Sequence, residues 1–490
     1  MLFYRPAPGL FVSDLWCTQH EGLWYVYGCQ GDANIGLATS PDLTDYTYQG
    51  VAIPGDWFGG DVFRWKGKHY MVYSHMGTEG NFINLASSDD LRQWKDLPGN
   101  PILSFPDPRW YDGAVYKKSL RAVSNCRDPH FIKDASTGEW AYLCFAADTG
   151  RGDPYRRACI GLARSRDLKT WQYLPPLFAP ARSMLMEVPR VCRIGGKWFL
   201  TWLDAPWYGQ RPGEEGPRPP SGPADVMIQY ALADHPLGPY RLADDPTLLQ
   251  GQFSPYVIDF ARVGRRVMVV CNMFCQHGDR PDAATRGGLL PAMPIRQARG
   301  NPGKLEIHFP RTIRPLFHRR PRLVAGLRVN NPEHPHPDVK RRGRTITFTR
   351  TSTRLVELTG ATGCDLIVDV DLRLTAGRAG IVTRYADRRG CAVLIDPARA
   401  QLQFVEVHPA FRSAVILKTL ERHAVTGPLR RAFRLAVIQS HDTMLVFVND
   451  VLAATFSFAR REKGKVALLL ENASGACRVR GVSARKSETN

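Results

Sequence analysis

Short runs of apolar residues, many alternating with polar ones, follow one another along the whole chain and are separated by turns rich in Gly, Pro and Asp. In the first 310 residues these runs come in pairs around a polar turn, which is typical of β-hairpins. No run keeps the 3.6-residue spacing of an amphipathic helix over a useful length, so a helical solenoid is excluded. The five hairpins cover residues 15–28, 62–74, 129–147, 188–204 and 256–274. We therefore predict an all-β protein.

A short motif recurs after the hairpins. It consists of a strand of apolar and small residues, a Ser or Ala, a tight Asp-Leu or Pro-Leu turn and an aromatic residue. Its copies are LATSPDLTDY (37–46), LASSDDLRQW (85–94), LARSRDLKTW (162–171) and the weaker YALADHPLGPY (230–240). Four-stranded units that repeat at intervals of roughly 40 to 70 residues are typical of propeller blades. The pattern predicts a five-bladed β-propeller in residues 1–310.

The chain changes character after the propeller. Residues 311–345 are rich in Pro, Arg and His without periodicity, as in a linker that leads into a first strand. From residue 346 onwards, short alternating strands resume without the blade motif. Strands at regular spacing without helices favour a β-sandwich. We predict a β-sandwich domain in residues 346–490.

Composition and cysteine content are those of an ordinary globular protein. The 490 residues are 44% hydrophobic and 23% charged, enough for two or three domains. No apolar stretch approaches the roughly 20 residues that span a bilayer, and the first residues lack the apolar region of a signal peptide. The eleven cysteines are odd in number and form no CxxC pair, which favours reduced thiols and a cytoplasmic protein. The alternative is an exported protein whose signal has been removed.

A formal net charge of +19 raises the question of nucleic-acid binding. The basic residues lie along the whole chain, however, and no nucleic-acid-binding module is visible. The densest cluster, at 340–344, follows a segment rich in Pro and His and is typical of a solvated linker. We favour general solubility or attraction to an acidic substrate, and expect neither a nucleic-acid nor a membrane partner.

Three carboxylates stand at the heads of predicted blades: Asp14 in blade 1, Asp128 in blade 3 and Glu187 in blade 4. The innermost strands of a propeller start near its central channel, so side chains at these starts converge. A single acid at such a place is as often a turn cap or a surface residue. Three together would repel one another unless a site uses their charge or keeps one protonated. We therefore expect a functional site at the channel mouth.

Several motifs resemble glycoside hydrolase family 32, the invertases and fructanases, and the related levansucrases. Arg127-Asp128-Pro129 resembles the Arg-Asp-Pro motif of that family, and Glu187 within MEVP resembles its Glu-Cys-Pro motif. Asp14 matches the place of the family's nucleophile. The segment 57–74 is similar to the one that carries its Phe-Ser-Gly-Ser sequence, and 433–456 is similar to the closing strands of its β-sandwich. The resemblance covers nearly the whole chain.

This resemblance implies a glycosidase that cleaves a furanoside bond of an oligosaccharide or glycoside, like a β-fructofuranosidase. By retaining double displacement, Asp14 would attack the anomeric carbon, and Glu187 would be the general acid/base. Asp128, held ionised by Arg127, would stabilise the transition state. No cofactor is implied, and no cluster of His and Cys has metal-ligand spacing.

The sequence departs from the family at the predicted nucleophile. Ser13-Asp14-Leu15 stands where family 32 reads Asn-Asp-Pro, and Asp14-Leu15-Trp16 has some likeness to the Asp-x-Trp of levansucrases. Family 43 arabinofuranosidases and xylosidases share the three-carboxylate propeller but invert configuration. Arg127 favours family 32, since family 43 generally lacks it. An inactive glycan-binding propeller is the other alternative, although all three acids are present.

Aromatic residues near the predicted mouth are candidate substrate contacts. Trp57 and Phe58 are expected to form the wall of the −1 site, and Trp16 follows from the levansucrase likeness. Trp110 and Trp207 lie in connections where their faces could stack on sugars. The connection 205–225, which holds Trp207, is far longer than a hairpin loop and is typical of a lid or binding loop.

Overall fold

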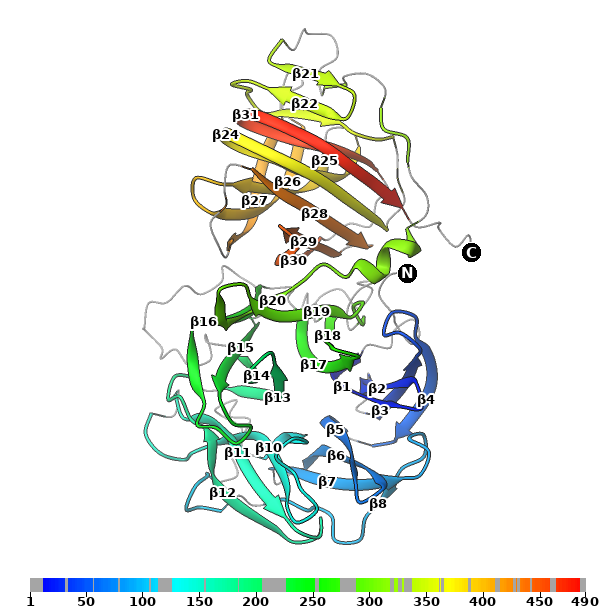
Figure 1. The fold of residues 1–490 in the computed structure, drawn as a ribbon, viewed down its shortest axis with the longest axis vertical. Coiled ribbons are helices and arrows are strands. Elements are labelled where there is room, and N and C mark those ends of the chain that lie inside the picture. Colours follow the sequence, from blue (N-terminus) through cyan, green and yellow to red (C-terminus); the bar gives the residue numbers. More distant parts are fainter. Residues whose placement is uncertain are drawn as a thin grey trace. The chain divides into compact units, whose positions relative to one another are not determined.

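The computed structural model describes residues 12–484 with gaps, the longest being 113–125, 205–225 and 274–287. The chain divides into two compact units, Phe3–Ile307 and His308–Asn490, with Met1–Leu2 grouped with the second. Both units consist of β-strands, which confirms the predicted all-β class (Figure 1). The 3₁₀-helix η2 (Arg311–Leu316) is short, and no helix in the described ranges is long and apolar enough to cross a membrane.

The first unit is the predicted five-bladed propeller. Each blade is a four-stranded antiparallel sheet whose strands pair in chain order (Figure 1). The first strands form a closed ring, because β1 contacts β5 and β17, and β9 contacts β5 and β13, which in turn contacts β17. The strands are β1 (Val12–His20), β2 (Leu23–Gln30), β3 (Asn34–Ser40), β4 (Thr47–Ile53), β5 (Trp57–Trp65), β6 (Lys68–Gly77), β7 (Gly80–Ser88), β8 (Lys95–Asp96), β9 (Arg127–Phe131), β10 (Ala141–Asp148), β11 (Ala158–Ser165), β12 (Trp171–Phe178), β13 (Met186–Ile194), β14 (Lys197–Asp204), β15 (Val226–Ala233), β16 (Arg241–Gly251), β17 (Pro255–Val263), β18 (Arg266–Met273), β19 (Met293–Ala298) and β20 (Asn301–Ile307).

The repeated Ser-x-Asp-Leu motif forms the turn between the third and fourth strands of a blade. In blade 1 the Leu43 N–H donates to Ser40 Oγ at 2.8 Å, and Asp42 Oδ1 accepts two N–H bonds from the residues that follow. Leu43 has a φ of 61°. The same bonds recur at 88–91 and 165–168, with leucine φ values of 60° and 62°. Side chains of Ser and Asp that bond nearby backbone groups stabilise such turns locally.

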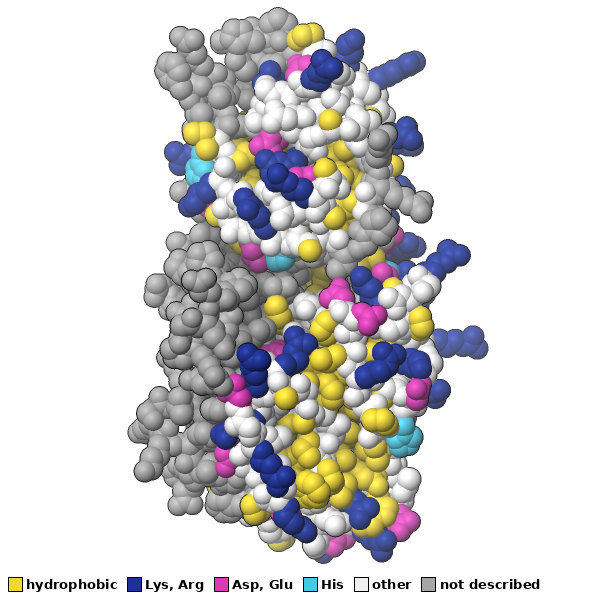
Figure 2. Space-filling view, turned by 90° about the vertical axis from the view of Figure 1, so that its left-hand side faces the viewer, with side chains coloured by type: hydrophobic (Ala, Val, Ile, Leu, Met, Phe, Trp, Pro, Cys, Tyr) yellow, Lys and Arg dark blue, Asp and Glu magenta, His cyan; other side chains and the backbone are white. Residues whose placement is uncertain are grey.

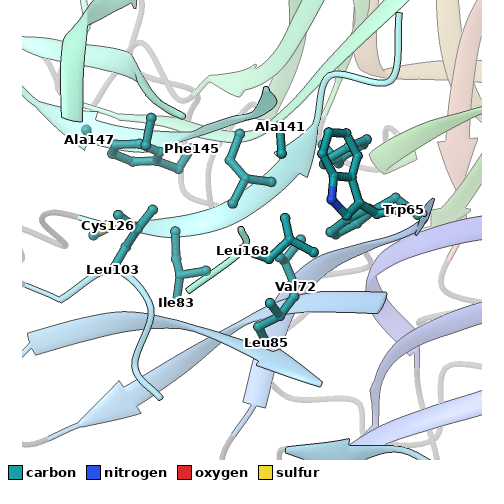
Figure 3. Packing of buried hydrophobic residues seen from close by; sticks show 14 of the residues in the cluster. Trp65, Val72, Ile83, Leu85, Leu103, Cys126, Ala141, Phe145, Ala147 and Leu168 are labelled. Atoms are coloured by element: carbon teal, nitrogen blue, oxygen red, sulfur yellow. The ribbon is translucent and has the colours of Figure 1, made fainter. Parts of the chain in front are cut away.

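The blades pack against one another through the apolar faces of their strands. Between blades 2 and 3, side chains from both sheets form one buried cluster (Figure 3). Phe63 of β5 and Phe131 of β9 stack within it, with ring centroids 3.8 Å apart. The first strands of the two blades are thus in direct contact through their side chains.

The second unit holds an eleven-stranded sheet, consistent with the predicted β-sandwich. Its two longest strands, β24 and β31, pair with each other, and β24 also pairs with β25 and β28. The alternating apolar residues of these strands are buried. The strands are β21 (Val339–Arg342), β22 (Thr345–Phe348), β23 (Arg354–Glu357), β24 (Leu366–Ala386), β25 (Arg389–Asp396), β26 (Gln401–Pro409), β27 (Val415–Ala424), β28 (Ala432–Ser440), β29 (Thr443–Val448), β30 (Val451–Ser457) and β31 (Lys465–Ala484).

The basic cluster at 340–344 has a regular structure. It forms the hairpin of β21 and β22, with Gly343 in the turn at a φ of 58°. β22 pairs in turn with β31. The interpretation of this cluster as a solvated linker is therefore corrected: its side chains stand on a sheet.

Candidate active site

The first strands of blades 1, 3 and 4 each contain a bulge near their start. The pairing register breaks after Ser13, after Arg127 and after Glu187. The residues that follow these breaks are Asp14, Asp128 and Val188, with φ values of 46°, 53° and 48°. Positive φ is uncommon for residues other than glycine, and bulges re-aim side chains at functional sites. Asp14 and Asp128 therefore occupy equivalent positions, whereas Glu187 lies one residue earlier, at the position of Arg127.

Arg127 joins two of the predicted acids. Its Nη2 donates to Glu187 Oε1 at 2.5 Å, and its Nε lies 3.5 Å from Asp128 Oδ2. The Val188 N–H also donates to Asp128 Oδ2, at 3.1 Å. Asp128 and Arg127 are buried, while the Glu187 side chain stays 17% exposed. Ion pairs and hydrogen bonds thus hold the strand starts of blades 3 and 4 together, and Glu187 is the member of this network that solvent can reach.

Blade 2 supports this network with residues that were not predicted. The Asp128 N–H donates to Ser74 Oγ at 2.7 Å, and Ser74 Oγ donates to the Gly59 carbonyl at 3.2 Å. A Cβ atom on Gly59, whose φ is 43°, would overlap Asp128 Oδ1. The double glycine after Phe58 was the available signal in the sequence, because glycine permits close approach of the backbone.

Arg190 is a further residue that the sequence analysis missed. It is fully buried, and its Nη2 donates to the carbonyls of Leu15 and Gly60 at 3.2 and 3.0 Å. Its Nε lies 3.3 Å from Asp259 Oδ1 of β17. The side chain therefore ties blades 1, 2 and 5 to blade 4, and the Leu15 carbonyl that it bonds belongs to the residue after Asp14. An arginine within an apolar strand was the signal, because such residues are rarely buried without a partner.

Burial governs the electrostatics of the acids. It raises the pKa of Asp14 to about 8, assisted by the charges of Asp128 and Glu187 and opposed by those of Arg127 and Arg190. Burial also raises the pKa of Asp128 and of Glu187, and Arg127 opposes it in both cases. Interacting carboxyls titrate as a group. The cluster therefore keeps at least one proton near neutral pH, as a site that needs both an acid and a carboxylate requires.

The positive charge near the acids comes from arginine side chains. Within the described ranges, no group of three or more His, Cys, Asp or Glu residues is arranged to hold a metal ion. Arg127 contacts Asp128 and Glu187 directly, and the charge of Arg190 lowers the pKa of Asp14 and Asp128.

The aromatic residues predicted to contact substrate lie in different surroundings. Trp57 and Phe58, both half-buried, lie beside Gly59, and the Trp57 ring also contacts Tyr73 and His75. Trp16 is 0% exposed and stacks on Tyr27 within a core cluster, so its prediction as a substrate contact is corrected.

The remaining two predicted contacts are Trp110 and Trp207. Trp110 packs, half-buried, against the apolar cluster between blades 2 and 3. Packing accounts for its position. Trp207 and the connection 205–225 lie outside the described residues.

The described residues thus form a five-bladed propeller with three carboxylates and an arginine at the starts of its first strands. Residues 23–210 match the family model described as the N-terminal domain of glycosyl hydrolases family 32. The resemblance to this family is thereby confirmed, and the matched segment includes Arg127, Asp128 and Glu187. Asp14 precedes it.

Several solved structures share the fold over almost the whole chain. A β-fructofuranosidase from Bombyx mori is 14% identical, with 98% of this chain and 94% of that chain covered and a TM-score of 0.63. A fructofuranosidase from Schwanniomyces occidentalis is 14% identical over 99% and 97%, with a TM-score of 0.65. Fructan 1-exohydrolase IIa from Cichorium intybus is 12% identical over 99% and 97%, also at 0.65. No curated protein matches.

The position of Asp128 is expected to depend on the missing side chain at residue 59. Gly59→Ala should lower turnover by about two orders of magnitude, because the new methyl group displaces the Asp128 carboxyl. Gly67→Ala is the matched control: Gly67 also has a positive φ, of 88°, but a Cβ there meets no atom within 4 Å. Both variants should lose about 1–2 kcal/mol of stability from strain. Equal activity in the two variants would contradict this role for Gly59.

Asp14 is expected to lower the stability of the fold at alkaline pH. Its pKa is raised when folded, so the folded state binds more protons than the unfolded chain between about pH 4 and 8. Stability is therefore lost as the pH rises through this window. Asp14→Asn should remove the loss, on the order of a few kcal/mol at pH 9.

Thermal unfolding of both proteins between pH 4 and 9 measures this effect. The variant's advantage should widen with pH. Asp89→Asn removes a carboxylate that is 92% exposed and should give no such widening. An advantage that is constant or shrinks with pH would show that Asp14 is not destabilised by burial.

Proposed function

We propose that this protein is a glycoside hydrolase that cleaves a furanoside bond of β-fructofuranosidase type with retention of configuration. The observation that carries the proposal is the pair of ion pairs by which Arg127 joins Asp128 to Glu187. The raised pKa of Asp14, to which the charges of both acids contribute, adds to it. The family match and the fold of the fructofuranosidase structures support the same substrate class. Structures in that group were determined with sucrose and with 1-kestose, which supports an oligosaccharide substrate here.

Each acid has a separate role in the proposed reaction. Glu187, the partly exposed carboxyl, donates a proton to the leaving oxygen while Asp14 attacks the anomeric carbon and forms a covalent glycosyl-enzyme. Glu187 then takes a proton from a water molecule, whose oxygen attacks the anomeric carbon; the bond between the sugar and Asp14 breaks, and the Asp14 carboxylate is restored. Asp128, held by Arg127 and the Val188 N–H, stays fixed and stabilises the charge of the transition state.

The protonation state must change before the first step. In the free site Asp14 has a pKa of about 8, and Glu187 is paired with Arg127. Attack requires Asp14 ionised and Glu187 protonated, so a proton must pass from the first acid to the second as substrate binds. Coupled carboxyls can exchange a proton in this way because their titration belongs to the group.

Hydrolysis assays on sucrose, inulin-type fructans and aryl furanosides test the proposal. We expect activity on fructosides, with a first product of retained configuration when followed by NMR. Inversion on an arabinofuranoside or xyloside would place the site with the family 43 alternative. Binding of these sugars without hydrolysis would favour the inactive glycan-binding propeller.

We further propose a cytoplasmic location. Seven thiols have no disulfide partner among the described residues: Cys17, Cys126, Cys144, Cys159, Cys192, Cys271 and Cys477. A reducing compartment would keep thiols in this form.

A further inference from the structure

The positive charge of the protein is concentrated in its second unit. Residues 308–490 contain 32 Lys and Arg against 15 Asp and Glu, a formal net charge of +17. Residues 1–307 contain 33 against 31 and carry only +2. Basic residues therefore lie in both units, as the sequence indicates, but the second unit is shorter and has half as many acids to offset them. Figure 2 shows Lys and Arg side chains projecting from the described surface of this unit.

Strand register gathers part of this charge on one face of the sheet. Arg342, Thr345, Arg478, Asp371 and Arg434 stand opposite one another across β21, β22, β31, β24 and β28. Adjacent strands are about 4.8 Å apart, so this row spans about 19 Å. The intervening residues on the same strands, such as Ile346, Leu372 and Phe433, are buried on the opposite side.

A second row lies two residues along the same strands. It places Lys340, Thr347, Ala476, Arg373 and Ala432 side by side. Side chains two residues apart on a strand share a face, so both rows belong to one surface. We call this surface the basic face.

Four cations of the basic face are not neutralised. Lys340, Arg342, Arg373 and Arg478 are exposed and make no ion pair within the described part of the chain. The single acid of the two rows, Asp371, pairs with Arg480 at 3.2 Å. Exposed cations with this spacing attract an anion rather than stabilise the fold.

The middle of the basic face is hollowed into an open groove. Its volume is ≈ 400 Å³, and its lining includes Thr345, Asp371, Arg373, Arg434, Asn449 and Arg478. Arg434 is bonded to Asp369 and Asp450, whereas Arg373 and Arg478 can bind carboxylate or sulfate groups through two parallel hydrogen bonds. Asp371 and Asn449 offer acceptors for hydroxyl groups. The groove thus combines donors for anions with acceptors for sugar hydroxyls.

We propose that the basic face binds a linear acidic polysaccharide that carries carboxylate or sulfate groups along its chain. The groove would hold one or two sugar units, and the rows on either side would contact the anionic groups of their neighbours. This binding lies beyond the proposed hydrolysis and does not depend on it.

The lining of the groove favours a polysaccharide over a nucleic acid. Binding of single strands relies on exposed aromatic side chains that stack on bases. Among the described residues that line the groove, the aromatic one is Phe433, and it is only 4% exposed.

Binding of the full chain to three probes tests the proposal: a sulfated heparin fragment, a polygalacturonate fragment of similar length, and DNA of similar charge in single-stranded and duplex form. Titrations are made between 0.05 and 0.3 M salt, roughly the range in which counterion release is measured. Arg373→Gln/Arg478→Gln removes two charges from the groove. Arg389→Gln/Arg422→Gln removes two exposed charges from β25 and β27, outside it.

We expect the groove variant to bind at least one polysaccharide about tenfold more weakly or worse, with a salt slope smaller by about 2. The control variant should keep its affinity within about twofold of the unchanged protein. Heparin and polygalacturonate distinguish sulfate from carboxylate recognition. Hydrolysis of a small aryl furanoside should be the same in both variants, so failure of this proposal is separable from failure of the proposed function.

Three outcomes would overturn the proposal. Equal losses in the two variants would mean that diffuse charge, and not the groove, binds the polymer. If neither polysaccharide binds at the lowest salt concentration, the basic face does not bind an acidic polysaccharide. Tighter binding of DNA than of either polysaccharide, with the same dependence on Arg373 and Arg478, would make it a nucleic-acid surface.

Discussion

Asp14→Ala is expected to abolish turnover, with a loss of about four orders of magnitude or more. Asp14 is the acid at the bulge of the first strand of blade 1, and the charges of Asp128 and Glu187 help to raise its pKa. No other described acid of blade 1 stands at this bulge, so none there could replace Asp14 as the nucleophile. A slowly turned-over fluorinated furanoside should leave one sugar on the unchanged protein. Intact mass should show a single adduct, which peptide mapping should place within residues 10–20.

The control for this experiment is Asp89→Ala, which removes an exposed carboxylate of the same propeller. It should keep full activity and still form the adduct. If the unchanged protein forms no adduct and its first product has the opposite anomeric configuration, Asp14 acts as a general base on water. The site would then function like those of family 43, and the fructoside proposal would fall with it.

Glu187→Ala is expected to lower turnover by about two orders of magnitude or more on substrates with poor leaving groups. Such substrates need a proton on the departing oxygen, and Glu187 is the partly exposed carboxyl that can supply it. Activated aryl glycosides leave without this help, so their first step should be affected less. Added azide should partly restore activity on them, because it replaces water as the attacking group.

The fold should survive this change, since Arg127 keeps Asp128 as a partner. Glu139→Ala, which removes a carboxylate that is 65% exposed, is the control and should leave activity unchanged. A loss of the same size for good and poor leaving groups would show that Glu187 positions Arg127 instead of transferring a proton.

Local patterns in the sequence were sufficient for the fold. Alternation of apolar and polar residues places side chains two apart on one face, so the strands could be predicted without knowledge of their partners. The Ser-x-Asp-Leu turns are stabilised by bonds that span two or three residues, as at Leu43 and Leu168. The acids at the strand starts were also recognisable, because Arg127, Asp128 and Glu187 lie within short motifs.

Contacts between residues far apart in the sequence could not be predicted, because they depend on how the blades pack against one another. Arg190 bonds carbonyls that are 175 and 130 positions away, and Gly59 matters only because blade 3 brings Asp128 against it. Trp16 reads as a candidate sugar contact in its local context, yet blade packing buries it completely.

The basic face shows the same division. The sequence alone determined that the protein carries excess positive charge, because a formal net charge of +19 follows from its composition. Only the pairing of β21, β22, β31 and β24, which lie as far as about 130 residues apart, brought Arg342, Arg478 and Arg373 onto one surface. The alternation of residues along one strand decides which of its side chains share a face. The neighbouring strand and its register depend on the packing of the whole sheet. This packing therefore decides which charged side chains of different strands lie together.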